Sequence, residues 1–90
     1  SIIQAMSAKQ QRTLAAIFTV PPPANILWSD VIALLQSLGA AISEGRGSRV
    51  RIELNGLEAI FHRPHPRKET DRGAVASMRR FMEQAGVKPC

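Results

Sequence analysis

The chain has 90 residues, which is enough for one domain with a modest core. Its apolar fraction of 44% excludes wholesale disorder, and its apolar runs are too short to cross a bilayer. Twelve Lys and Arg against seven Asp and Glu give a net charge of +5, and the stretch from Arg46 to Arg80 carries all of that excess with nine cations and four anions. Charge concentrated in this way favours a polyanionic partner. The alternative is a solvated basic surface that serves only solubility.

The single cysteine, Cys90, excludes an intrachain disulfide and fits a reducing compartment. No signal-peptide pattern opens the chain. We therefore expect a cytoplasmic protein that does not associate with a membrane.

A first helix is predicted over about 8–18. Ser7 and Gln10 have the spacing of a capping box, and Leu14, Ile17 and Phe18 follow at helical spacing. The three prolines at 21–23 end this helix and give a stiff, extended connector. We therefore divide the chain into an N-terminal helix with its connector, residues 1–27, and a domain over residues 28–90. The helix is expected to be an appendage that docks on the domain or on a partner.

A second helix should begin with Ser29 as its cap and Asp30 in its first turn, and it should end at Gly39. Its buried stripe has the i, i+3, i+4, i+7 spacing and consists of Val31, Leu34, Leu35 and Leu38. The period then changes to that of strands, with a short strand over 41–44 and a flexible turn over 45–48 that contains two glycines.

A hairpin is the most specific local prediction. Residues 49–54 alternate between charged and apolar side chains, Asn55-Gly56 is typical of a two-residue type I′ turn, and residues 57–62 form the returning strand. This turn fixes the register. The apolar pairs 54/57, 52/59 and 50/61 then face the core, and the pairs 49/62 and 51/60 face the other way. Arg49 and His62 should be cross-strand neighbours, with Cβ atoms about 5 Å apart.

Two prolines, Pro64 and Pro66, exclude regular pairing in the segment after the hairpin. A last helix is predicted over about 72–85, with a buried stripe of Val75, Met78, Met82 and Ala85. The expected fold class is α+β, a three-stranded antiparallel sheet with helices on one face and an extra N-terminal helix. The other face of the sheet is left open to solvent or ligand.

Residues 28–89 resemble the HicA family of bacterial toxins, small ribonucleases that cleave mRNA and have an αβββα fold like that of double-stranded-RNA-binding domains. The features that carry the resemblance are Leu38-Gly39, Gly47-Ser48, the hairpin, the loop 64–66 followed by Lys68-Glu69, and the final residues 83–87. The family usually has Gly-Ser-His at the turn, with the histidine as its catalytic residue. Here Arg49 follows Gly47-Ser48, so the resemblance implies the fold and RNA contact more firmly than cleavage.

Metal-independent RNA cleavage needs groups that move protons and a cation for the charge on the phosphate. Histidine exchanges protons near neutral pH, and the guanidinium fork binds two phosphate oxygens. We therefore predict that His62 is the general acid/base and that Arg49 clamps the phosphate, the alternative being that His62 is an ordinary strand-end residue. His65 either binds phosphate or caps its loop. The remaining predicted RNA contacts lie around the open face and along the loop: Arg46, Gly47, Ser48, Arg51, Arg63 and Lys68, with Arg67 beside them.

No metal site is predicted, because no cysteine and no well-placed carboxylate joins the two histidines, and no small-molecule cofactor is expected. Arg79 and Arg80 are expected to face solvent or a partner. The resemblance implies mRNA or another RNA and a HicB-type antitoxin as partners. The functional alternatives are a metal-independent mRNA endonuclease, a non-catalytic RNA-binding or regulatory module, and a protein-interaction domain whose helix 8–18 recruits a partner.

Overall fold

The structure is a computed structural model that describes residues 6–89, so Cys90 lies outside the described residues. Three helices and three strands follow one another in the predicted order. They are α1 (Ala8–Ile17), α2 (Trp28–Ser37), β1 (Ala41–Glu44), β2 (Arg49–Leu54), β3 (Leu57–His62) and α3 (Arg72–Gln84). Within this part of the chain, no helix combines the length and the apolar character needed to cross a membrane.

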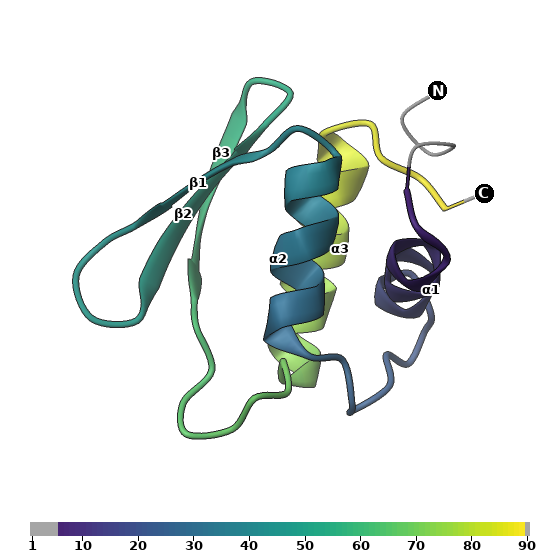
Figure 1. Cartoon of the computed structure of the whole chain (residues 1–90), viewed down its shortest axis with the longest axis horizontal. Coiled ribbons are helices and arrows are strands. Elements are labelled where there is room, and N and C mark those ends of the chain that lie inside the picture. Colours follow the sequence, from purple (N-terminus) through teal and green to yellow (C-terminus); the bar gives the residue numbers. More distant parts are fainter. Residues whose placement is uncertain (1–5, 90) are drawn as a thin grey trace.

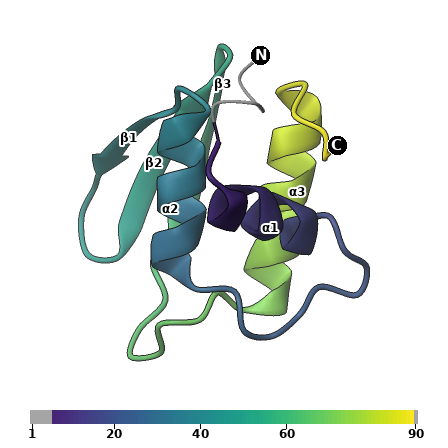
Figure 2. The ribbon, with the colours of Figure 1, turned by 45° about the vertical axis from the view of Figure 1, so that its right-hand side comes forward.

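The elements form three layers (Figure 1). The sheet is antiparallel with the order β1-β2-β3, and α2 and α3 cover one of its faces. Helix α1 lies across α2 and α3 on the side away from the sheet (Figure 2). Both views leave the outer face of the sheet uncovered by any described residue. The predicted α+β class, with its helices on one side of the sheet as in a double-stranded-RNA-binding domain, is confirmed.

The hairpin has the predicted register, because Asn55 and Gly56 adopt the positive φ angles of 52° and 83° that a type I′ turn requires. Asn55 has a second function, since its Nδ2 donates to the carbonyl oxygen of Ala85 at 2.7 Å and so ties the turn to the end of α3. The core prediction fails at one position. Leu54 is 2% exposed, but Leu57 opposite it is 36% exposed, since it lies on the edge strand β3 whereas Leu54 lies on the central strand β2.

The predicted capping box of α1 is confirmed by hydrogen bonds of 3.1 and 3.0 Å between Ser7 and Gln10. The predicted Ser29 cap of α2 is wrong. The helix begins at Trp28 after an N-cap Leu27 that makes no side-chain cap bond. The reason is tertiary: the Trp28 N–H donates to the carbonyl of Lys68 at 3.0 Å, so a distant loop satisfies the start of the helix.

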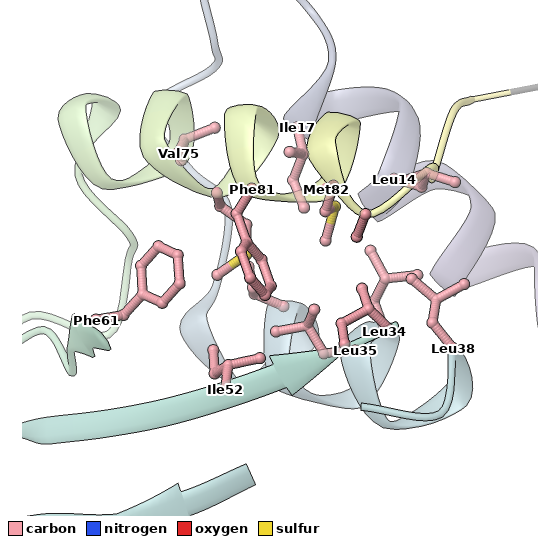
Figure 3. Close-up of a cluster of buried hydrophobic side chains, with 14 of the residues drawn as sticks. Leu14, Ile17, Leu34, Leu35, Leu38, Ile52, Phe61, Val75, Phe81 and Met82 are labelled. Carbon is pink, nitrogen blue, oxygen red and sulfur yellow. The ribbon is translucent and has the colours of Figure 1, made fainter. Parts of the chain in front are cut away.

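One hydrophobic core joins all three helices to the sheet (Figure 3). Ile17 of α1 is 0% exposed and lies in the same cluster as Leu34 of α2, Ile52 of β2 and Met82 of α3. Helix α1 is therefore an integral layer of the described structure. We expected it to dock either on the domain or on a partner, and the structure shows it docked on the domain.

Polar contacts hold α1 at both of its ends. Lys9 Nζ lies 3.3 Å from Asp30 Oδ1 of α2. Arg79 Nη1 of α3 donates to the carbonyls of Thr19 at 3.3 Å and of Ile17 at 3.5 Å, where α1 ends. The expectation that Arg79 faces solvent or a partner is therefore wrong, because its guanidinium binds the free carbonyl groups that every helix leaves at its C-terminal end.

The topology sets where a site can form. Three antiparallel strands separate α2 from α3, so the two helices run parallel and begin at the same end of the molecule. Strand β2 also begins at this end and β3 finishes there (Figure 1). The partial positive charges of two helix N-termini therefore lie near the same end as the basic turn and loop.

Candidate functional site

Arg49 and His62 lie side by side on the open face. They are directly opposite each other in the β2–β3 ladder, and both are exposed. Ser48 Oγ lies 3.3 Å from His62 Nδ1, within hydrogen-bond distance. Because this contact occupies Nδ1, the ring nitrogen Nε2 is the one left to face solvent. The predicted juxtaposition of a guanidinium and an imidazole is confirmed, with a hydroxyl added beside them.

The turn over residues 45–48 positions this group. It is closed by the N–H of Gly45, which donates to the Arg49 carbonyl at 2.9 Å, and by the N–H of Arg49, which donates to the Arg46 carbonyl at 3.2 Å. Gly47 has a φ of +62°, which favours glycine. The N–H of Arg63 donates to the Ser48 carbonyl at 2.8 Å, so Ser48 is fixed to the end of β3 beside His62. The side chain of Arg46 is exposed on this turn.

Arg51 lies further along the open face and is opposite Ile60. Its Nε is 3.9 Å from Glu58 Oε1, and both side chains are more than half exposed. This diagonal ion pair gives Glu58 a cationic neighbour in addition to the like charge of Glu53 opposite it. A pair this exposed contributes little to stability, so Arg51 is free to exchange Glu58 for an anionic ligand at small cost.

A hollow of about 630 Å³ adjoins His62, between the end of β3, the following loop and the start of α3. His62 and His65 both line it, so the structure brings the two histidines of the chain to one cavity. Its other lining residues are Ala24, Arg63, Pro64, Arg67, Glu69, Thr70, Asp71 and Arg72. Asp71 is committed to capping α3, where its Oδ1 accepts from the N–H of Ala74 at 2.7 Å.

Two residues of this hollow carry no specific signal in the sequence. Arg72 belongs to the basic stretch, but only the start of α3 beside the loop shows that it lines the cavity with the histidines. Thr70 is 3% exposed, and its Oγ1 is buried without a hydrogen-bond partner among the described residues. Both positions depend on the pairing of residues 68–70 with residues 26–28, which are distant in the sequence.

We expected Arg63 and Lys68 to extend the open face into the loop. Arg63 lines the hollow beside His62, and Lys68 does not. Arg63 turns toward the helix side of the sheet, where its Nη1 forms an ion pair with Glu44 of β1 and its side chain lines a groove with Trp28 and Ile42. Lys68 lines a second hollow beside Trp28, on the side of the loop toward the start of α2. The pairing of residues 26–28 with 68–70 places Lys68 beside the start of α2.

Among residues 6–89, no group of three or more His, Cys, Asp or Glu side chains is arranged to hold a metal ion. The described chain presents an imidazole, a guanidinium and a hydroxyl where β2 begins and β3 ends, next to a basic hollow.

These features define a small, basic α+β domain whose uncovered sheet face carries Arg49, Arg51 and His62. The model of the family described as the HicA toxin of bacterial toxin–antitoxin systems matches residues 28–87. The chain belongs to the HicA toxin family. Searches of the curated proteins and of the solved structures found no match. Helix α1 and its connector precede the matched segment.

Proposed function

We propose that this member of the HicA toxin family binds RNA on the open face of its sheet and cleaves it without a metal ion. The observation that carries the proposal is the exposed cross-strand pair of Arg49 and His62, with Ser48 Oγ 3.3 Å from the imidazole. Family membership supports a toxin and an antitoxin partner, and the chemistry of the pair supports a phosphodiester substrate.

In the proposed reaction, the 2′-hydroxyl of a ribose attacks the adjacent phosphorus and the bond from phosphorus to the 5′ oxygen breaks. The products are a 2′,3′-cyclic phosphate and a free 5′-hydroxyl, so no water or oxidant is consumed. His62 Nε2 accepts the proton of the attacking hydroxyl. The guanidinium of Arg49 binds the two non-bridging oxygens as negative charge develops on them. His65, which lines the same hollow, supplies the proton that the departing oxygen requires.

The basic residues around this pair would hold the ribose-phosphate backbone. The turn 45–48 contributes Arg46 and the exposed backbone at Gly47, the open face contributes Arg51, and the loop contributes Arg67 and Arg72. Contacts of this kind give an affinity that falls steeply with salt and depends little on sequence. An antitoxin of the HicB type, with acidic residues on its surface, would compete with RNA for the same arginines.

The test is cleavage of a labelled transcript by purified protein in the presence of a chelator. His62→Ala should abolish cleavage and leave the unfolding transition unchanged, because the side chain is exposed. Glu53→Gln is the matched control, since Glu53 lies on the same face at the far end of β2 and should not affect cleavage. Full activity of the His62→Ala protein would overturn the assignment of His62.

A second candidate is a non-catalytic RNA-binding or regulatory module. Arg49 favours it, because the resemblance places the catalytic histidine of the family at this position. The same assay separates the two candidates: RNA that is retained but stays intact supports the module. Failure to bind RNA at low salt would reject both and would favour a protein-interaction domain.

A further inference from the structure

A second hollow, of about 310 Å³, lies between the start of α2 and the loop after β3. Apart from Ser29, its walls combine two kinds of side chain. The apolar and aromatic members are Leu27, Trp28, Pro64 and Pro66. The cationic members are Arg63, Arg67 and Lys68. Flat apolar surface flanked by cations is the combination that binds a nucleobase together with its phosphates.

The backbone holds the two walls of this hollow at a fixed separation. Leu27 and Glu69 form an antiparallel β-bridge. It is flanked by a hydrogen bond of 2.7 Å from the N–H of Thr70 to the carbonyl of Ile26, and by the bond of 3.0 Å from the N–H of Trp28 to the carbonyl of Lys68. The hollow is therefore formed before any ligand arrives, which lowers the entropic cost of binding.

Trp28 is the aromatic surface available at this site. It is half-buried at the first position of α2 and lines both this hollow and the adjoining groove that contains Ile32 and Ile42. Leu27 beside it is 36% exposed, one of four large apolar side chains with this much exposure among the described residues. The other aromatic residues do not line this hollow: Phe61 and Phe81 are buried in the core and contact each other edge to face, and Phe18 packs against the core at the end of α1.

The hollow adjoins the site around His62 across the loop. Arg63, Pro64 and Arg67 line both cavities, one on each side of the loop. A single strand of RNA bound at His62 and Arg49 would therefore meet Trp28 after crossing this loop, with a cation beside it along the way.

We propose that this hollow binds one unpaired nucleobase of the RNA, stacked on Trp28, while Arg67 and Lys68 bind the phosphates that flank it. The inference rests on the proposed RNA substrate and adds a specificity element to it. A base inside a duplex is already stacked on its neighbours, so a site of this kind selects single-stranded RNA at the position next to the cleaved bond. A base-free polyanion would satisfy the cations and leave the apolar walls empty.

The test uses the intrinsic fluorescence of the protein, because Trp28 is the only tryptophan and the chain has no tyrosine. Titration with a short single-stranded oligoribonucleotide should quench this fluorescence. Titration with heparin, a polyanion without bases, should not. Trp28→Leu should weaken RNA binding, measured by fluorescence anisotropy of a labelled oligoribonucleotide, by at least about fivefold. Trp28→Phe, which keeps an aromatic surface, should lose less affinity, and thermal melts of both variants check that the fold is retained.

The outcomes separate this inference from the proposed function. If the oligoribonucleotide binds without quenching Trp28, and Trp28→Leu binds as well as the parent, the stacking site is overturned while RNA binding stands; the hollow would then belong to a protein partner. Equal quenching by heparin and RNA would also overturn it, because the fluorescence would then report charge alone. If no RNA binds at low salt, both proposals fall.

Discussion

Substitution of Ile17 tests whether α1 is part of the folded domain. Its side chain is 0% exposed and points from α1 into the cluster that contains Leu34 and Met82 (Figure 3). Ile17→Ala removes three carbon atoms, worth about 2.4 kcal/mol of transfer free energy, and the remaining cavity brings the expected loss to about 3 kcal/mol. A domain of this size has a total stability of roughly 5–13 kcal/mol, so the loss is a large share.

The assay is urea-induced unfolding followed by circular dichroism, with the free energy of unfolding extrapolated to water. Val20→Ala is the matched control, because Val20 is 74% exposed and its truncation should change the free energy by less than about 0.5 kcal/mol. A loss below about 1 kcal/mol for Ile17→Ala would refute the reasoning, since it would mean that α1 is dispensable to the core.

Two further stability predictions follow from polar contacts. Asn55→Ala should lower the free energy of unfolding by about 2 kcal/mol, because it removes the 2.7 Å hydrogen bond to the Ala85 carbonyl. It also places alanine, which lacks a polar side chain, at a φ of 52°. A urea midpoint equal to that of the parent would contradict this prediction. Arg79→Ala should cost about 1 kcal/mol and speed proteolysis of the connector after α1. Arg80→Ala should cost less than about 0.5 kcal/mol, because Arg80 is exposed and bonds to Ser77 of its own helix. Equal proteolysis of these two variants would show that Arg79 does not hold α1 in place.

The parts of the fold that could be predicted from the sequence are those that local chemistry determines. Asn55-Gly56 specifies a two-residue turn, and the turn together with the strand alternation specifies which residues meet, including Arg49 and His62. The apolar spacing of 31, 34, 35 and 38 likewise specifies α2 without knowledge of its neighbours.

The parts that could not be predicted depend on pairing between distant segments. Ser29 is a good capping residue, yet the carbonyl of Lys68 satisfies the Trp28 N–H and the helix starts earlier. The same pairing places Lys68 beside Trp28, so the second hollow has no signature in either segment alone. Arg79 has the pattern of a surface residue, because nothing in its own helix shows that α1 ends beside it.

The tight hairpin end limits how this protein can vary. If one residue were added between Asn55 and Gly56 while β2 kept its place and the turn stayed two residues long, every side chain of the returning strand would change face. The imidazole of His62 would then enter the hydrophobic layer, and the ring of Phe61 would emerge beside Arg49. An added residue at this end must therefore be taken up in a longer loop for the pairing of Arg49 with His62 to persist.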